Sequence, residues 1–289
     1  RWSGPGDLTV RDFTQEEGGP VIIAFRQGFA EDESESMLTA FRQGSAIQGN
    51  VAVTGAGSRL QVDGEFRIGG SGDGLLEVSN QALVSSANAI QLQGQNGKTA
   101  RLILSGKTAG KLDVDNIIGL GAAGDVTQQS LELRHNNSSQ NPFHLVNASN
   151  QAILLEGSLD LRSYSGSTRI SGNNTFTLGT QIEGGHLITA STSALGTGPV
   201  NLVSGQLELA NALKIQSLNW TGGTLHLAPV ENTLLTVQDQ LSVSTDGGNF
   251  LMAHEGLEPE ATYELLRYGQ SSAKASDFQA DFAHSNPLV

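Results

Sequence analysis

The chain has 289 residues, with 36 glycines, 37% hydrophobic residues and only 5% aromatic residues, a composition unlike that of a compact enzyme with one large core. Its 16 lysines and arginines against 29 aspartates and glutamates give a net charge of −13, which argues against nucleic acid or anionic lipid as a partner because both bind basic surfaces. Because cysteine is absent, disulfides, thiolate metal sites and cysteine nucleophiles are excluded.

Residues 1–44 form an atypical N-terminal part. The sequence Ala-Phe-Arg-Gln-Gly occurs at residues 24–28 and again at 40–44, and residues 31–36 between the two copies are the densest acidic run of the chain. We expect two similar solenoid strands joined by a solvated loop or a helical turn. The alternative is a site for a cation or a basic partner, formed by Glu31, Asp32, Glu33 and Glu35. The chain begins at Arg1 without a methionine or a signal sequence, so we expect a fragment of a longer precursor.

From residue 51 to residue 243 the chain repeats a short unit, in which two apolar residues flank a single residue and a turn of Gly, Asn, Ser or Asp follows. This spacing places both apolar side chains on one face of a strand and the residue between them on the other face, towards solvent. The intervening residues include Arg67, Gln91, Asp113, Asp160, Thr177, Glu208 and His226. The apolar pairs, which predict the core, are Val51/Val53, Leu60/Val62, Phe66/Ile68, Ile90/Leu92, Leu102/Leu104, Leu112/Val114, Leu131/Leu133, Leu159/Leu161, Phe176/Leu178, Leu207/Leu209, Leu225/Leu227 and Leu241/Val243.

Strands this short and evenly spaced occur in β-sandwiches, β-propellers and β-solenoids. Sandwich strands are usually longer, and propeller blades repeat at roughly 40–50 residues with aromatic signatures, which this chain lacks. Helical periodicity is nearly absent, so helical crossovers are excluded. The remaining fold is all-β, a parallel β-helix (solenoid) with roughly 20–25 residues per coil. Disorder, the alternative for an acidic glycine-rich chain, does not predict regular apolar pairs.

We expect residues 1–248 to form the β-helix, because the spacing of apolar residues changes from residue 249 onward. Residues 263–268, Tyr-Glu-Leu-Leu-Arg-Tyr, hold two of the three tyrosines, and Phe278 and Phe282 follow them. An open solenoid end exposes unpaired strand edges and needs covering. Residues 249–289 are therefore predicted to form a C-terminal cap.

Residues 184–209 carry a more specific pattern: Gly-Gly-His-Leu-Ile at 184–188, Ser-Ala-Leu-Gly-Thr-Gly-Pro-Val at 193–200 and Gly-Gln-Leu-Glu-Leu at 205–209. Residues 222–225, Gly-Gly-Thr-Leu, repeat its opening element. The pattern closely resembles the passenger-associated transport repeat of bacterial autotransporters, with His186 where the family usually has threonine and Gln206 where a second small residue is common. A looser resemblance to AIDA-type adhesin passengers covers most of the chain. The matching motif positions, which are structural, are Gly184, Gly185, Ser193, Ala194, Leu195, Gly196, Gly198, Pro199, Gly205, Leu207 and Leu209.

This resemblance implies a secreted, right-handed parallel β-helix, the membrane-proximal part of an autotransporter passenger domain. Such a passenger is exported through the outer membrane and displayed on a Gram-negative bacterial cell surface. In the precursor it is attached to a C-terminal outer-membrane β-barrel, absent from this chain, and residues 249–289 correspond to the autochaperone-like end of the passenger. Family members of this type are commonly adhesins, aggregation factors or biofilm factors. The lack of cysteine fits, because a disulfide formed before export would hinder threading.

The chain offers few groups for catalysis. Asp113 and Asp115 lie on one strand face, about 7 Å apart at ~3.4 Å per residue, and are the nearest match to the carboxylate clusters of Ca²⁺-dependent pectate-lyase-like enzymes. We expect both to be solvated. Residues 69–74 have the letters but not the order of a serine-protease motif and predict a turn. The six histidines are scattered without metal-ligand spacing, so we expect solvent-facing histidines, no metal site and no cofactor.

We therefore expect a non-catalytic protein that acts in adhesion, autoaggregation or biofilm formation. The expected partners are host-surface or matrix glycans and proteins, or copies of the protein on other cells. Two alternatives remain open. The chain is an inert stalk that presents a functional region further N-terminal, or it is a polysaccharide lyase or hydrolase. The second alternative predicts a concave acidic cleft lined by Asp and Arg from neighbouring coils.

Overall fold

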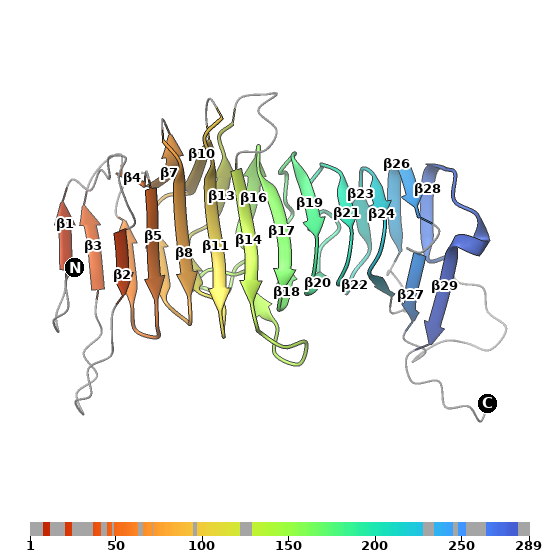
Figure 1. Cartoon of the computed structure of the whole chain (residues 1–289), viewed down its shortest axis with the longest axis horizontal. Helices are drawn as coiled ribbons and strands as arrows, with labels where there is room; N and C mark the ends of the chain where they lie inside the picture. The colour runs from red at the N-terminus through yellow and green to blue at the C-terminus, as the bar shows by residue number, and fades with distance from the viewer. Residues whose placement is uncertain are drawn as a thin grey trace.

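The computed structural model shows an elongated stack of short parallel strands (Figure 1). It describes residues 8–11, 21–24, 37–41, 45–47, 49–62, 66–70, 72–94, 97–121, 129–227, 234–244, 248–252 and 264–282. Within these residues one short 3₁₀ turn, η1 (Ala275–Asp277), is the sole helical element. The predicted all-β class is therefore confirmed.

Two five-stranded sheets lie in the N-terminal half of the stack. Sheet A contains β1 (Leu8–Arg11), β3 (Met37–Phe41), β6 (Arg59–Val62), β9 (Leu83–Ser86) and β12 (Lys111–Asp113). Sheet B contains β4 (Ser45–Ile47), β7 (Phe66–Gly70), β10 (Ile90–Gly94), β13 (Asn116–Gly119) and β16 (Leu154–Gly157).

Two longer sheets extend to the C-terminal end. Sheet C, with 12 strands, contains β2 (Val21–Ala24), β5 (Gly49–Thr54), β8 (Gly74–Ser79), β11 (Ala100–Gly106), β14 (Gln129–His135), β17 (Asp160–Ser165), β19 (Gly179–Ile182), β21 (Val200–Leu202), β23 (Leu213–Ile215), β24 (Leu218–Trp220), β26 (Leu235–Val243) and β28 (Leu266–Ser271). Sheet D, with seven, contains β15 (Phe143–His144), β18 (Ser167–Ile170), β20 (His186–Thr189), β22 (Gln206–Leu209), β25 (Thr224–Leu227), β27 (Gly248–Met252) and β29 (Phe278–Phe282).

The chain visits the sheets in a repeating order, which makes the fold a parallel β-helix. Coils from β6 to β14 place one strand each in sheets A, B and C. The strands β15, β16 and β17 then lie in sheets D, B and C, and from β18 onward the strands lie in sheets C and D only. The pairings between named strands are parallel throughout. In Figure 1 sheet C runs downwards on the near side while the chain advances to the right, which is the sense of a right-handed coil.

The core is a column of aliphatic side chains inside the coils. Every apolar pair predicted to face inward is buried except at Leu178 and Val243, which are half-buried. In register, Leu76 lies beside Leu102 and Leu102 beside Leu131, so each coil stacks its apolar residues on those of the next. This stacking explains why so few aromatic residues suffice, since each coil fills only a thin layer.

Coil length varies more than the sequence predicts. Leu207 pairs with Leu225, 18 positions further on, whereas Ile117 pairs with Leu155, 38 positions further on. The extra length of the longest coil lies in residues 122–128, outside the described part of the chain, and in the residues between β14 and β16, which include a hairpin closed by an antiparallel bridge between Val146 and Ala152. Because the coils differ in length, the pairing of residues on different coils cannot be predicted from their spacing in the sequence alone.

Both ends of the chain join the same stack. β1, β2 and β3, from the atypical N-terminal part, pair within sheets A and C. At the other end, β27, β28 and β29 extend sheets C and D, with β28 and β29 in the last coil. Phe278 lies 6.2 Å from the buried ring of Trp220, measured between ring centroids. The described residues of 249–289 therefore continue the parallel sheets over the C-terminal end of the core, and their assignment as a separate cap stays a prediction.

Candidate functional site

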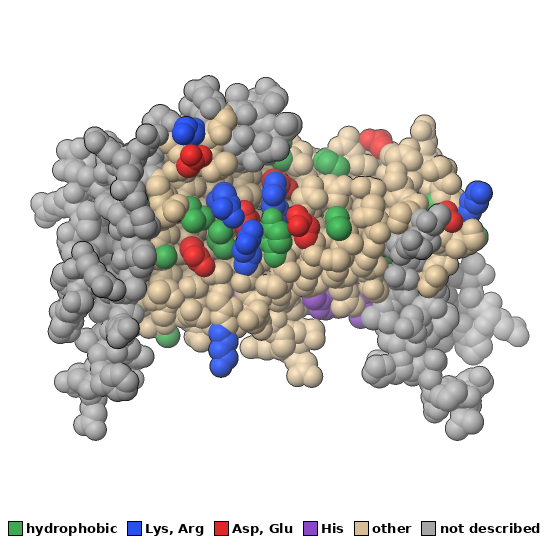
Figure 2. Space-filling model, viewed as in Figure 1, with side chains coloured by type: hydrophobic (Ala, Val, Ile, Leu, Met, Phe, Trp, Pro, Cys, Tyr) green, Lys and Arg blue, Asp and Glu red, His purple; other side chains and the backbone are tan. Residues whose placement is uncertain are grey.

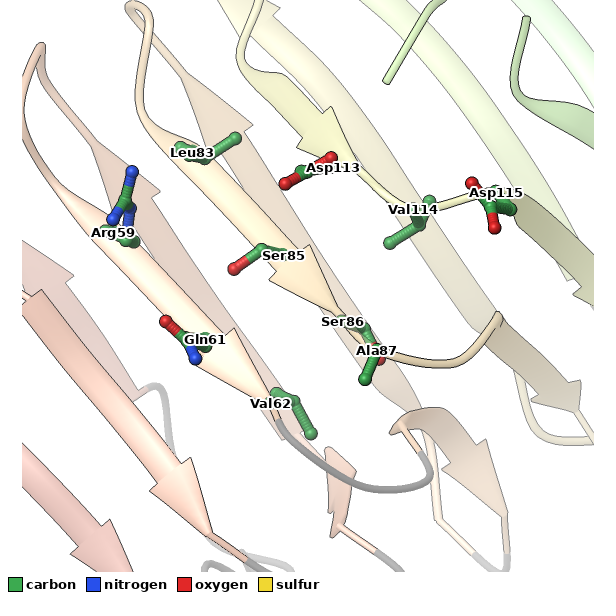
Figure 3. Close-up of a pocket in the computed structure, with 10 residues that line it drawn as sticks. All are labelled: Arg59, Gln61, Val62, Leu83, Ser85, Ser86, Ala87, Asp113, Val114 and Asp115. Carbon is green, nitrogen blue, oxygen red and sulfur yellow. The ribbon is translucent and has the colours of Figure 1, made fainter. Parts of the chain in front are cut away.

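A shallow groove crosses the outer face of sheet A on strands β6, β9 and β12 (Figure 3). The register pairs Gln61 with Ser85 and Ser85 with Asp113, so these three polar side chains form one row across three coils. Period 2 turns them outward, because Leu60, Val84 and Leu112 beside them in sequence are buried. The groove has a volume of about 360 Å³ and is lined by Arg59, Gln61, Val62, Leu83, Ser85, Ser86, Ala87, Asp113, Val114 and Asp115.

Asp113 and Asp115, the two candidates of the sequence analysis, both line this groove, and each also holds a neighbouring loop. Asp113 Oδ1 accepts a hydrogen bond from the backbone N–H of Ala148 at 3.0 Å. Asp115 Oδ1 accepts one from the side-chain amide of Asn147, also at 3.0 Å. The two carboxylates face outward as expected, and they fix the hairpin loop 147–151 beside the groove.

Arg59 and the two aspartates line the same groove from coils that are two apart. Arg59 pairs with Leu83 and Leu83 with Lys111, so Arg59 lies two strand spacings of about 4.8 Å and two residues along the strand from Asp113. In the part of the chain that the structure describes, Arg59 forms no ion pair with either carboxylate. The groove thus offers separate hydrogen-bond donors and acceptors along its length.

The other candidate residues of the sequence analysis, Glu31, Asp32, Glu33 and Glu35, lie outside the described residues. A second polar hollow, near the motif region, is lined by Thr192, Ser193, Gly196, Thr197, Lys214, Gln216, Gln238 and Asp239.

The residues of the transport-repeat motif build the corners of the coils. Gly185, Gly205 and Gly223 precede strands of sheet D in successive coils and have φ of 72°, 77° and 76°. A Cβ on Gly205 would lie 2.6 Å from the carbonyl oxygen of Gly185, and a Cβ on Gly223 would lie 2.7 Å from that of Gly205. Only glycine fits both the positive φ and the close stacking of these corners. The motif positions Ala194 and Leu195 are fully buried.

The outer face of sheet C carries a charged cluster on β11, β14 and β17, near the centre of the face shown in Figure 2. Glu132, only 2% exposed, accepts two hydrogen bonds from Arg101 at 2.7 and 2.9 Å and one from Arg134 at 2.8 Å. Burial acts to raise the pKa of Glu132, but the hydrogen bonds and charges of these arginines outweigh it, and the pKa is lowered.

Asp160 belongs to the same face, where Arg162 Nε donates to its Oδ2 at 2.6 Å. Asp160 points to the outer face as predicted, but it is only 7% exposed and not solvated, and burial raises the pKa of its carboxyl. The charges of this cluster are largely paired with one another, which indicates a structural role.

His135, at the end of β14, is fully buried and not solvent-facing as predicted. Its Nδ1 accepts from the backbone N–H of Asn137 at 3.2 Å, so Nε2 carries the proton and donates to Thr168 Oγ1 at 2.8 Å. Burial lowers the pKa of His135 to about 4. The imidazole is therefore a neutral structural residue at pH 7.

Two further histidines meet Glu208 on the outer face of sheet D. Glu208 Oε2 lies 2.8 Å from His186 Nε2 and 3.1 Å from His226 Nδ1. The contact with His186, followed by that with His226, lowers the pKa of Glu208 to about 2. The prediction that the histidines lie apart is wrong for this pair.

One signal in the sequence could have found this cluster. The three elements beginning Gly-Gly-His-Leu, Gly-Gln-Leu-Glu and Gly-Gly-Thr-Leu align on Leu187, Leu207 and Leu225, which are paired in the structure. That alignment pairs Glu208 with His226 on one neighbouring strand. On the other neighbouring strand it pairs Glu208 with Ile188, which lies two residues after His186 and on the same face. Aligning the elements of the family motif therefore predicts which residues pair between strands, whereas the spacing of the histidines in the sequence does not.

Comparisons with protein-family models, with curated proteins and with solved structures find no match. Among the residues that the structure describes, no helix has the length and apolar character to cross a membrane.

Proposed function

We propose that this chain is a surface-displayed, non-catalytic binding β-helix of the autotransporter passenger class, which acts in adhesion or in aggregation between cells. The observation that carries the proposal is the groove on sheet A, where polar side chains from three coils form one row. The partner is an extended glycan on a host surface, in the matrix or on a neighbouring cell.

The chemistry of the groove favours a neutral polyhydroxylated polymer. Ser85, Gln61 and Asp113 provide donors and acceptors at intervals of one strand spacing, about 4.8 Å, comparable with the length of a sugar unit. Leu83, which is half-buried on β9, provides apolar contact for the face of a sugar ring. The net charge of −13 disfavours polyanions.

The assignment to the passenger class rests on the resemblance of residues 184–209. Two observations support it: the glycines of the motif form stacked corners at positive φ, and the chain is a parallel β-helix. Display on a cell surface after export follows from that class and remains part of the proposal.

A polysaccharide-active enzyme is the second candidate, because the groove holds an arginine and two aspartates from neighbouring coils. Lyases of this kind use carboxylates that bind Ca²⁺ and an arginine base close to the cleaved bond. Here one oxygen of each carboxylate is engaged by loop 147–151, and Arg59 lies two strands from Asp113. These features favour binding over turnover.

The test is a glycan and matrix-protein array with the purified chain and two matched variants. Ser85→Tyr puts a bulky side chain on the floor of the groove without touching the carboxylates. Asn219→Tyr makes the same addition at an exposed outward position of β24, on sheet C. We expect binding that Ser85→Tyr abolishes and Asn219→Tyr leaves within about twofold. The same contrast is expected for the adhesion of cells that display the chain.

Each other outcome contradicts part of the proposal. Binding lost only in Asn219→Tyr would move the binding face to sheet C. Absence of binding and of aggregation would favour an inert stalk. Turnover of a polyuronate, with or without Ca²⁺, that Asp113→Asn or Asp115→Asn abolishes would make the groove an active site.

A further inference from the structure

Three potential metal ligands from successive coils converge on the outer face of sheet D. His186 lies on β20, Glu208 on β22 and His226 on β25, and one ligand atom from each lies within 4.8 Å of the other two. Histidine side chains are visible in purple along the lower edge of the molecule in Figure 2. This cluster lies on a different sheet from the groove, so it is independent of the proposed binding function.

The spacing of the three ligand atoms suits a small transition-metal ion. Zn–N and Zn–O bonds of about 2.0–2.2 Å place the donors of a tetrahedral site about 3.3 Å apart. Glu208 Oε2 lies 2.8 and 3.1 Å from the two imidazole nitrogens, and all three ligand atoms lie within 4.8 Å of one another, so rotation of the side chains would admit the ion. Strand pairing fixes the three backbones, which leaves only side-chain rotation to form the site.

His186 has the surroundings of a metal ligand. Its Nε2 is buried and, among the described residues, has no aligned hydrogen-bond partner, although Glu208 Oε2 lies nearby. Its Nδ1 lies 3.4 Å from Ser167 Oγ, a contact that orients the ring and turns Nε2 towards Glu208. Metal-bound histidines commonly have such a partner on the second nitrogen.

The surroundings also leave the cluster open to an ion from solvent. The side chains of His186, Glu208 and His226 are 14%, 28% and 23% exposed. Ile188, buried and paired in register with Glu208, separates the cluster from Arg169, the nearest basic residue in this row of sheet D. The low exposure strengthens the attraction of the carboxylate for a cation.

We propose that His186, Glu208 and His226 form a binding site for a divalent transition-metal ion of the Zn²⁺ type. Two imidazoles and one carboxylate suit Zn²⁺, Cu²⁺ or Ni²⁺, whereas Mg²⁺ and Ca²⁺ prefer oxygen ligands. The ion links three coils that are 20 and 18 residues apart in sequence, and a water molecule or a ligand from outside completes its coordination. Metal binding therefore stabilises the C-terminal half of the stack.

The test measures Zn²⁺ binding to the metal-free chain by calorimetry and follows its melting temperature. Glu208→Gln keeps the shape and hydrogen-bonding capacity of the side chain but removes the charged ligand, and His226→Gln removes one imidazole. His144→Gln is the matched control, because His144 is exposed on β15 of the same sheet. We expect one Zn²⁺ per chain, a raised melting temperature, and an affinity roughly tenfold lower or worse in the two site variants.

Several results would overturn the proposal. They are the absence of saturable binding at one equivalent of Zn²⁺, an affinity unchanged in Glu208→Gln and His226→Gln, or an equal response to Mg²⁺. X-ray absorption of the zinc-loaded wild-type chain gives an answer that does not depend on folding of the variants. It should show two imidazole ligands and one carboxylate, and a shell without imidazole would reject the site.

Discussion

Single polar side chains inside the stack satisfy backbone groups where strand pairing is interrupted. Asn174, 1% exposed, accepts a hydrogen bond from the N–H of Leu155 at 2.9 Å and donates one to the carbonyl of Ala194 at 2.7 Å. It therefore bridges the coils before and after its own, on the side of the stack where sheet B has ended. Since a buried unpaired polar group costs roughly 1–3 kcal/mol, such residues stabilise the corners.

His135 makes the stability of the protein depend on pH. Its pKa is about 4 in the folded chain and about 6.5 in an unfolded one, so the unfolded state binds more protons between these values. Stability is therefore lost as the pH falls through this window, by about 2 kcal/mol between pH 7 and pH 5. Urea unfolding at both pH values measures this loss.

The matched variant for this prediction is His135→Gln, which keeps a polar side chain able to donate to Thr168. It should be less stable than wild type at pH 7, and the difference between the two chains should shrink by about 2 kcal/mol at pH 5. An equal difference at the two pH values would show that His135 is not the titrating group.

At the scale of the strand and turn, corners rather than strands set the closest approach between coils. Gly205 and Gly57 both have positive φ, of 77° and 83°. A Cβ on Gly205 would meet the Gly185 carbonyl oxygen at 2.6 Å, whereas a Cβ on Gly57 would have no atom within 4 Å. Comparing alanine variants at the two glycines therefore distinguishes the cost of the backbone conformation from the cost of disturbing the stacking of coils.

We expect Gly57→Ala to cost about 1–2 kcal/mol, the cost of a left-handed conformation alone. Gly205→Ala should cost about 2–5 kcal/mol, because the added methyl group also forces neighbouring coils apart. Thermal and urea unfolding of the two variants checks the difference. Equal losses would mean that conformation alone, and not coil stacking, requires glycine at the corner.

At the scale of the whole molecule, the sequence predicts what each strand buries but not how the coils align. The alternation at Leu102 and Leu104 predicts that both side chains face the core, and this prediction needs no information from the rest of the chain. Pairing Ser85 with Asp113 needs the length of one particular coil, and coils here range from 18 to 38 residues. The candidates Asp113 and Asp115 were therefore identifiable from the sequence, whereas the groove that contains them was not.

The histidine–glutamate cluster shows the same limit. His186, Glu208 and His226 are separated by coil lengths and not by a helical or strand period, so spacing rules for metal ligands do not detect them. Burial of His135 was also beyond the sequence, because a polar residue at the inward end of β14 breaks the apolar pattern there. In both cases contacts between coils, and not local pattern, set the environment.

The C-terminal segment provides the last test of how the stack is closed. Deleting residues 249–289 removes β28, β29 and most of β27, and leaves the edges of β25 and β26 unpaired. Trp220, fully buried, loses its contact with Phe278, and Leu235 and Leu241 lose their neighbours in the last coil. Exposed parallel edges beside apolar side chains promote association between chains.

We therefore expect the truncated chain to aggregate or to melt at a lower temperature than the full chain, measured by light scattering and thermal unfolding. Tyr268→Ser in the full chain is the control, because Tyr268 is 48% exposed on β28 and its removal leaves the strand pairing intact. That variant should scatter light like the full chain and change in stability by less than about 0.5 kcal/mol. A truncated chain that is monomeric and melts like the full one would show that β25 and β26 need no covering coil.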